Sequence, residues 1–206
     1  MLVEMRTYSF RPGFLGRALD KIALGVAERT TLSPLGGLWY SDIGRRHQIV
    51  HLWPYESLAH RESVRGRFGG LKNWPARTTD FTAESETKIL SPAPFSPPLA
   101  PRKAGPVYEI CTDTCRPDKL KELPDLWAAR IEGRMKLAPL IGAWQTTLGP
   151  MYQWIHIWAY ESLARRAEVQ KEAAARRVWP PEEDPDEWYL RQDCGIYFPA
   201  AFSPLQ

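Results

Sequence analysis

An internal repeat limits the folds open to this chain. When the sequence is shifted by 105 positions, residues 4–61 align with residues 109–166 without a gap, and 23 of the 58 paired residues are identical. The string Tyr-Glu-Ser-Leu-Ala at 55–59 recurs at 160–164. Each unit is longer than the roughly 20–50 residues of a solenoid repeat, so the sequence indicates a duplicated domain.

The two copies are predicted to meet at a proline-rich join. Residues 91–106 hold six prolines, which favour extended backbone and a semi-rigid spacer. We therefore divide the chain into a first domain at 1–91, a linker at 92–106 and a second domain at 107–206. The second copy gains two residues near its end, and we assign that gain to the acidic loop at 181–187.

Each copy has the periodicity strand–helix–strand–strand–helix–strand. The first copy predicts strands at 3–10, 37–43, 47–53 and 82–90, with helices at 14–32 and from the N-cap Ser57 to 68. The second predicts strands at 108–115, 142–148, 152–158 and 188–198, with helices at 117–137 and 162–177. This order is the α+β, ferredoxin-like unit, an antiparallel sheet with both helices on one face.

The second strand of each predicted hairpin is apolar on both faces. Val50 and Leu52 alternate with Ile49, His51 and Trp53. A strand of this kind is buried on two sides, so we expect the two copies to pack sheet against sheet. We expect the aliphatic face to meet the helices and the Trp/His face to line the joint interior.

Composition and motifs exclude several classes of function. The net charge of +3 is too weak and mixed for a nucleic-acid binder, and no apolar run approaches the ~20 residues of a membrane span. A secretion signal is not visible at the start of the chain. There is no phosphate-binding or dinucleotide-binding glycine loop, no nucleophile elbow and no His-Glu-x-x-His motif.

The three cysteines are predicted to be in a reducing compartment, and Cys111 and Cys115 are predicted to be inert. They are an odd and sparse set, which favours a reducing compartment. Cys111 and Cys115 lie about 13 Å apart along one strand, too far for a disulfide or a shared ion.

Several segments resemble the NIPSNAP family. They are Met-Arg-Thr-Tyr at 5–8, Gly-Leu-Trp-Tyr at 37–40 and Val-His-Leu-Trp-x-Tyr-Glu-Ser-Leu-Ala-x-Arg at 50–61. The resemblance covers both copies and implies a dimeric α+β barrel, here formed within one chain. It implies no catalytic motif. Eukaryotic members are mitochondrial, so we expect a cytoplasmic protein if this is a bacterial member, and a mitochondrial one if a transit peptide was trimmed.

The paired His51 and His156 are the first candidate site residues. Each lies mid-strand between large apolar residues and could make a structural hydrogen bond, ligate haem or a metal, or contact a substrate. Five tryptophans accompany them and could either wall a pocket for a flat ligand or be core: Trp39, Trp53, Trp144, Trp154 and Trp158.

Glu4, Arg6 and Tyr8 share one face of the first strand and could orient a polar substrate or pair with one another. Only Glu4 is repeated, as Glu109, so a site would be asymmetric and richer in the first copy.

Two functions remain open. The first is a small-molecule binding or scaffold protein that uses the barrel interior for a small hydrophobic or aromatic ligand. The alternative is a monooxygenase-type or haem-binding enzyme acting on an aromatic ligand there. No cofactor is evident, with haem as the alternative; no nucleic acid is expected, and a homo-oligomer stays open.

Overall fold

The computed structural model describes residues 1–182 and 184–206, and its strands follow the predicted order. The strands are β1 (Leu2–Phe10), β2 (Gly37–Ile43), β3 (Gln48–Tyr55), β4 (Thr82–Pro92), β5 (Val107–Cys115), β6 (Leu140–Leu148), β7 (Gln153–Tyr160) and β8 (Tyr189–Pro199). The helices are α1 (Leu15–Thr30), α2 (Leu58–Gly66), α3 (Leu123–Met135) and α4 (Leu163–Ala175), with 3-10 turns η1 (Phe68–Gly70), η2 (Thr79–Phe81) and η3 (Pro185–Glu187). The loop at 181–187, to which the two-residue gain is assigned, includes residue 183, which lies outside the described residues.

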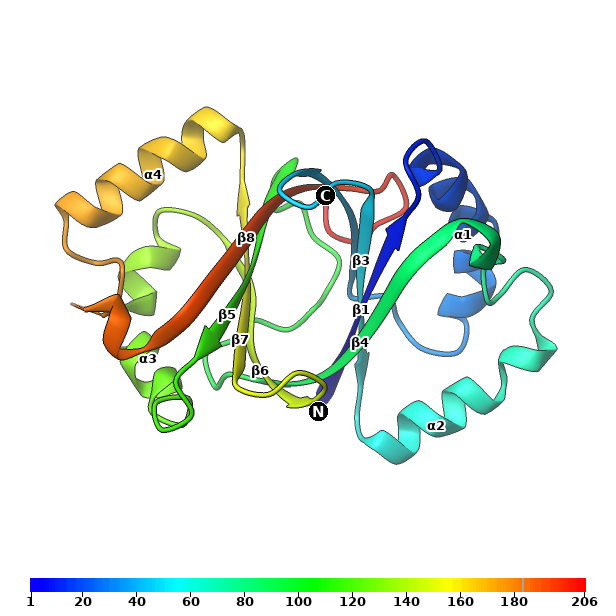
Figure 1. Ribbon diagram of the computed structural model, residues 1–206, viewed down its shortest axis with the longest axis horizontal. Coiled ribbons are helices and arrows are strands. Elements are labelled where there is room, and N and C mark those ends of the chain that lie inside the picture. The colour runs from blue at the N-terminus through cyan, green and yellow to red at the C-terminus, as the bar shows by residue number, and fades with distance from the viewer. Residues whose placement is uncertain (183) are drawn as a thin grey trace.

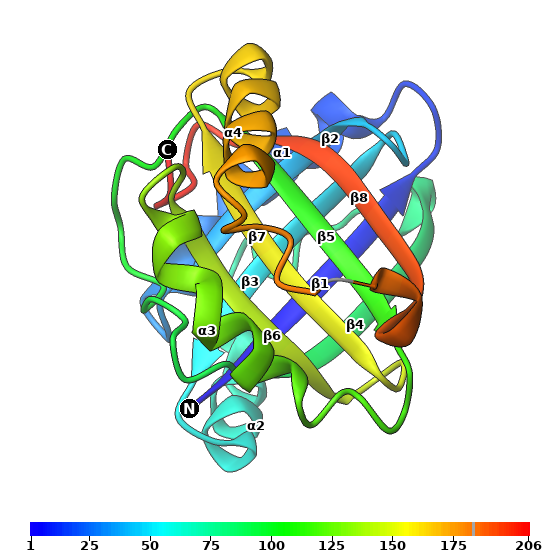
Figure 2. The same cartoon turned by 90° about the vertical axis from the view of Figure 1, so that its left-hand side faces the viewer.

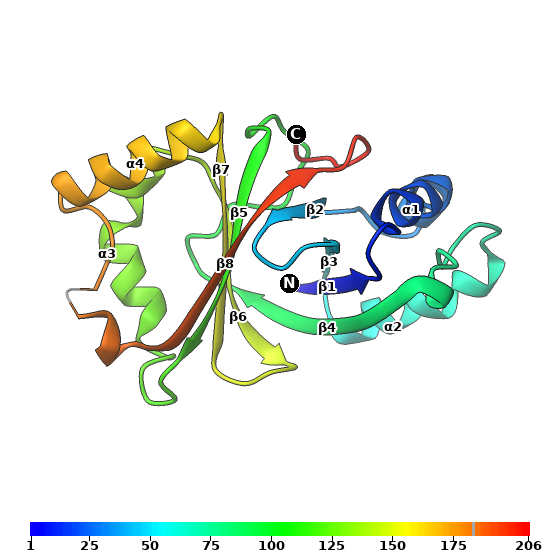
Figure 3. The ribbon, with the colours of Figure 1, turned by 45° about the horizontal axis from the view of Figure 1, so that its top comes forward.

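All the strands join in one closed antiparallel barrel, in the order β1-β3-β2-β8-β5-β7-β6-β4. Each repeat contributes a four-stranded ferredoxin-like sheet, and the two sheets meet through β2 with β8 and β4 with β6 (Figures 1 and 3). The predicted α+β fold, two tandem repeats packed sheet to sheet, is confirmed. Closure within one chain leaves none of these strands with an unpaired edge.

The helices cover the outer faces of the barrel. Helices α1 and α2 lie against the first repeat's sheet, and α3 and α4 lie against the second (Figures 1 and 2). This placement follows from the right-handed crossovers that connect β1 to β2 and β3 to β4 in each ferredoxin-like unit. Each repeat therefore has two buried layers, one inside the barrel and one between sheet and helices.

Helix starts follow local capping chemistry. The Ser57 hydroxyl accepts a hydrogen bond from the backbone N–H of His60, which confirms the predicted N-cap, and Ser162 caps α4 in the same way. Helix α3 begins at Leu123, later than the predicted 117. Pro124 lies in its first turn, where the missing N–H costs no intrahelical hydrogen bond.

The prediction of which face lines the barrel interior is wrong. Val50 and Leu52 pack inside the barrel, whereas Ile49 and Trp53 belong to the cluster that contacts α1. The second repeat repeats this arrangement, with its Trp/His face toward α3 and α4. Alternation assigned the residues to two faces correctly, but both faces are apolar, so the pattern carried no information on which face meets the helices.

Trp39 and Trp144 do lie inside the barrel, as expected, and each depends on a glycine. A Cβ on Gly37 would lie 2.1 Å from the Trp39 ring, and a Cβ on Gly142 would lie 2.2 Å from the Trp144 ring. Each indole folds back over the glycine two residues before it in the same strand. This contact explains why both Gly-x-Trp pairs recur in the repeat.

The linker packs against the second repeat rather than spanning open space. Its Ser96 hydroxyl donates to the backbone oxygen of Ala143 and accepts from the Ala143 N–H at 2.7 Å, and Arg102 forms a β-bridge with Leu205. Strand β4 ends at Pro92 and β5 begins at Val107, next to the predicted boundaries. The domain division itself stays a prediction.

The prediction that the cysteines are unpaired is wrong for two of them. Cys111 on β5 and Cys194 on β8 are directly opposed and form a disulfide across 83 residues of sequence. Spacing along one strand separates Cys111 from Cys115, but it gives no information on a cysteine in a neighbouring strand. Cys115 is free and buried, and burial raises the pKa of its thiol to about 12, so it stays protonated.

No helix in the described part of the chain is long and apolar enough to cross a membrane.

Candidate functional site

Each repeat contains a buried network of polar side chains between its sheet and its helices. In the first repeat, Arg61 on α2 donates to one carboxylate oxygen of Glu4 at 2.6 Å, and the Tyr55 hydroxyl lies 3.5 Å from the other. Arg29 on α1 donates to the Tyr55 hydroxyl at 2.7 Å, and its guanidinium carbon lies 3.9 Å from the centroid of the Trp53 ring. The network thus links α1 and α2 to β1 and β3.

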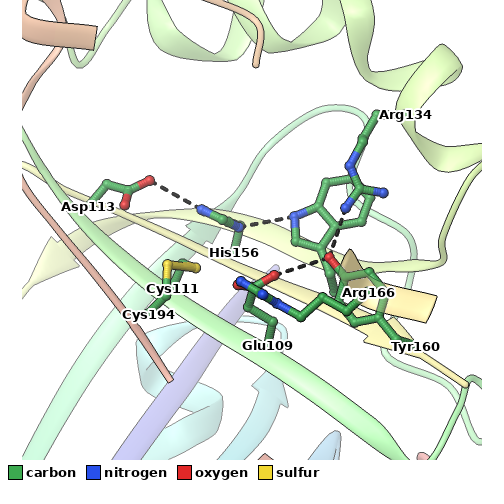
Figure 4. The surroundings of a disulfide bond; sticks show 9 residues. Glu109, Cys111, Asp113, Arg134, His156, Tyr160, Arg166 and Cys194 are labelled. Atoms are coloured by element: carbon green, nitrogen blue, oxygen red, sulfur yellow. Dashed lines mark hydrogen bonds and ion pairs between the residues drawn. A yellow bond between two sulfur atoms is a disulfide. The ribbon is translucent and has the colours of Figure 1, made fainter. Parts of the chain in front are cut away.

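The equivalent residues of the second repeat form the same network (Figure 4). Arg166 donates to Glu109, and Tyr160 donates to the other Glu109 oxygen at 3.1 Å. Arg134 donates to the Tyr160 hydroxyl at 2.8 Å and stacks 4.0 Å from the Trp158 ring centroid. Because the residues are identical and the contacts are the same, this network is a property of the repeat unit.

The network ends on the two paired histidines and determines their tautomers. The indole N–H of Trp53 donates to Nδ1 of His51 at 2.5 Å, and Trp158 donates to Nδ1 of His156 at 3.1 Å. A neutral imidazole whose Nδ1 accepts must carry its proton on Nε2. Nε2 of His156 lies 3.2 Å from Oδ2 of Asp113 and donates to it. Both histidines are therefore N–H donors at Nε2.

His51 is held neutral by its surroundings. The residue is 2% exposed, and burial lowers the pKa of its imidazole to about 3, with further lowering by the charges of Arg6 and Arg29. The Tyr8 ring stacks on the imidazole at 5.6 Å between centroids, and burial raises the pKa of the Tyr8 phenol. Both groups stay in their neutral, donor-bearing forms near neutral pH.

Glu4 is surrounded by more positive charge than it can neutralise. Its Oε1 lies 2.6 Å from Arg61, 3.7 Å from Arg65 and 3.8 Å from Arg6. In the second repeat, Arg6 is replaced by a cysteine and Arg65 by Gln170. The first repeat therefore carries an excess of guanidinium groups that its copy lacks.

These groups border a cavity of about 320 Å³, here called the first-repeat pocket. Its apolar walls are Phe10, Ile22, Trp53, Phe68 and Trp74. Its polar lining is Glu4, Arg6, Tyr8, Arg29, His51 and Arg65. A mostly apolar cavity with a few convergent polar groups is the usual form of a small-ligand site.

The equivalent cavity in the second repeat, the second-repeat pocket, has a volume of about 270 Å³. Its charged and polar lining includes Glu109, Asp113, Arg134, His156 and Glu182. Trp127, Trp158, Trp179 and Tyr189 form its aromatic wall. Two arginines of the first-repeat pocket, Arg6 and Arg65, are replaced here by Cys111 and Gln170, and Asp113 and Glu182 add acidic side chains to the lining.

The disulfide also borders the second-repeat pocket (Figure 4). Ligand atoms of Glu109, Cys111 and Cys194 lie within 4.8 Å of one another, as in a metal centre. The two sulfurs are bonded to each other, however, so neither is a thiolate that could bind a metal. In its oxidised form this cluster does not fit a metal ion.

The predicted site residues separate into three places. Glu4, Arg6, Tyr8, His51 and Trp53 meet in the first-repeat pocket, and His156 and Trp158 meet in the second. Trp39 and Trp144 lie inside the barrel, and Trp154 is core beneath α3. The expectation that these residues share the barrel interior is wrong, because the sheet separates the two pockets from that interior.

The sequence reasoning missed Arg29 and Arg134, which hold each network together. The two helices that carry them match at few positions, so an arginine kept at the same place in both copies was the available signal. It also missed Trp74 and Trp179 as pocket walls, although the Trp-Pro pair was visible in both copies.

A separate cleft of about 550 Å³ opens at one end of the barrel interior. Its lining is mostly polar and comes from both repeats, including Gln48, Lys88 and Thr112. None of the ten candidate side chains proposed from the sequence borders this cleft, so it does not extend the site.

Known proteins are similar to this chain over its full length. Protein NipSnap homolog 3B of Homo sapiens is 26% identical over 211 residues, which cover 98% of this chain and 85% of that protein. Among solved structures, a candidate monooxygenase of Lactobacillus acidophilus superposes with a TM-score of 0.71 at 7% identity, over 97% of this chain and 94% of that one.

An anthrone oxidase-like protein superposes with a TM-score of 0.65 at 10% identity, over 98% of this chain and 93% of that one. At these identities, the two structural likenesses establish the fold and leave the chemistry open. The NIPSNAP family model matches residues 3–97 and 108–204, one match for each repeat. The chain therefore belongs to the NIPSNAP family, and both of its repeats are NIPSNAP domains.

Proposed function

We propose that this protein binds a small aromatic organic anion, such as an aryl carboxylate, in the first-repeat pocket. It acts as a binding protein, and the barrel of two repeats is the scaffold that presents the pocket. The observation that carries the proposal is the group of three arginines around the single carboxylate of Glu4.

The charge balance supports an anionic ligand. Arg61 makes the short contact with Glu4 and neutralises it, which leaves Arg6 and Arg65 at 3.7–3.8 Å from the same oxygen. Their side chains are 24% and 33% exposed, so both reach the open side of the pocket. A guanidinium offers several N–H donors in a planar array and binds carboxylates through paired hydrogen bonds.

The remaining lining supports an aromatic body on that anion. The rings of Trp53, Phe68 and Trp74 offer flat apolar surface, and the pocket volume of about 320 Å³ suits a ligand of one or two rings. The Nε2–H of His51 and the hydroxyl of Tyr8 add neutral donors, which favour an acceptor group on the ligand.

The test is isothermal titration of the full chain with 2-naphthoate, beside its neutral isostere 2-naphthamide. We expect saturable binding of the acid and at least tenfold weaker binding of the amide. Arg65→Gln installs the residue that the second repeat has at this position, and it should weaken binding of the acid about tenfold.

Arg46→Gln is the matched control, because Arg46 is exposed in the β2–β3 turn and does not line the pocket. It should leave the affinity unchanged. Equal binding of acid and amide would refute the proposal, as would equal losses in the two arginine variants, since either result would mean that no directed anion site exists.

The alternative is a monooxygenase-type or haem-binding protein, and its support is the likeness in fold to an anthrone oxidase-like protein. The histidines do not fit haem ligation as they are held, because Nδ1 of each accepts an indole N–H and Nε2 carries a proton instead of a free lone pair. Titration with haemin should then give no saturable Soret band. A sharp band lost in His51→Ala or His156→Ala would establish the alternative in place of our proposal.

The partners and the compartment stay hypotheses. A homo-oligomer is compatible with a barrel that already closes within one chain, and light scattering of the purified protein tests it. We expected a reducing compartment because the cysteines were predicted to be unpaired. The Cys111–Cys194 disulfide removes the basis for that expectation. Neither point affects the anion site.

A further inference from the structure

The second-repeat pocket contains buried carboxylate oxygens without a partner. Asp113 is 1% exposed, and Oδ2 accepts from His156 while Oδ1 has no hydrogen-bond partner among the described residues (Figure 4). Glu182 is 8% exposed, and its Oε2 is also buried without a partner in the described chain. Both residues line the same cavity of about 270 Å³.

Two such oxygens on residues that line one cavity are unfavourable when no positive charge lies beside them. A buried polar atom without a partner has lost its hydration with nothing to replace it, and the cost is larger when the atom is charged. Burial raises the pKa of the Glu182 carboxyl, and the negative charge of Asp113 raises it further, whereas His156 lowers it. The pocket would therefore be stabilised by a positive charge placed between the two carboxyl groups.

The arginines of this repeat do not supply that charge. Arg166 is paired with Glu109, and Arg134 is bonded to Tyr160 and stacked on Trp158. Nε and Nη1 of Arg134 have no partner among the described residues, and neither arginine forms an ion pair with Asp113 or Glu182 there. At the position of Asp113 the first repeat has Tyr8, a neutral group. The two pockets thus share one framework and differ in the sign of the charge that lines them.

The aromatic wall indicates what body would accompany the charge. The rings of Trp127 and Trp179 lie 4.5 Å apart at 89°, and Tyr189 borders the same space. Aromatic rings next to carboxylates are the usual surroundings of organic cations, which they attract through their π faces.

We propose that the second-repeat pocket binds a primary organic ammonium with an aromatic or apolar body, its nitrogen between Oδ1 of Asp113 and Oε2 of Glu182. A primary ammonium has three N–H donors and can satisfy both oxygens, whereas a quaternary ammonium has none. The site is separate from the proposed anion site, so each can fail without the other.

The test is titration of the full chain with phenethylammonium, beside phenethyl alcohol and phenethyltrimethylammonium. We expect saturable binding of the primary ammonium and at least tenfold weaker binding of the other two. Glu182→Gln and Asp113→Asn should each weaken it about tenfold. Arg65→Gln, which should weaken binding of the anion, should leave this affinity unchanged.

Glu187→Gln is the control, because it removes the same charge from an exposed position in the same loop and should have no effect. Asp113→Asn keeps an oxygen that can accept from His156. Glu182 lies outside the helices and strands, so Glu182→Gln still tests the proposal if Asp113→Asn does not fold. The proposal is overturned if the primary ammonium does not saturate, if the alcohol binds equally, or if Glu187→Gln weakens binding as much as Glu182→Gln.

Discussion

Acidification should destabilise this protein through His51. The imidazole is buried and its pKa is lowered to about 3, whereas in the unfolded chain it has the ordinary value of about 6.5. Between these two values the unfolded chain binds a proton that the folded chain does not. Stability from the neutral imidazole is therefore complete above about pH 7 and is lost as the pH falls toward 3.

The size of the loss follows from the two pKa values. At pH 5 the unfolded imidazole is almost fully protonated and the folded one is not, so linkage gives a loss of about 2 kcal/mol relative to pH 8. The cause is physical: a proton on Nδ1 would break the hydrogen bond from Trp53, and the resulting charge would face Arg6 and Arg29 without water.

Urea unfolding of wild type and His51→Gln at pH 8 and pH 5 measures this effect. Wild type should lose about 2 kcal/mol more than His51→Gln between the two pH values, because the variant lacks the titrating group. The control is His60→Gln, which removes a partly exposed histidine on α2 and keeps His51, so it should retain the loss that His51 causes. Equal losses in wild type and His51→Gln would refute the reasoning, since the imidazole would then titrate alike in both states.

Three further substitutions test the packing. Trp53→Ala should lower the free energy of unfolding by about 3–5 kcal/mol, because Trp53 is 1% exposed and also supports the Arg29 guanidinium that stacks on it. A loss under about 1 kcal/mol in a urea titration would contradict its place in the core. Cys194→Ser should lower it by about 2–4 kcal/mol without reductant, and adding reductant to wild type should close that gap; an unchanged gap would mean that the bond does not form. Gly142→Ala should lower the free energy of unfolding by about 1–3 kcal/mol, because the added Cβ would lie 2.2 Å from the Trp144 ring. Gly66→Ala is the control and should not destabilise the protein, because nothing lies within 4 Å of its Cβ. Equal effects of the two substitutions would disprove the contact.

Much of the architecture could be predicted because it is encoded twice and locally. The repeat defined the unit, and strand and helix periods within each unit are set by neighbours in sequence. Ser57 caps its helix as predicted for the same reason, since a cap involves only a few consecutive residues. The α3 start was misplaced because residues 117–122 form turns, although their lysines, leucine and glutamate also favour a helix.

The candidate site was predicted in part. Glu4, Arg6 and Tyr8 share a strand face by simple alternation, and they do meet His51 in one pocket. Arg29 was missed because it reaches Trp53 from a helix, and nothing local links a helix position to a strand 24 residues later. The asymmetry between the repeats was predicted, whereas the opposite charge of the second pocket was not, because Glu182 joins it from a distant loop.

Residue order along the chain was enough to establish a duplicated ferredoxin-like unit, the pairing of faces within each strand and the family. The closed barrel was needed to decide which apolar face meets the helices. Both faces of β3 and β7 are apolar, so the alternation of side chains along the strand does not distinguish them. It also opposed Cys111 and Cys194 across two strands and gave the two pockets charges of opposite sign. Contacts between residues far apart in sequence depend on how the sheets close, and a linear pattern does not record that closure.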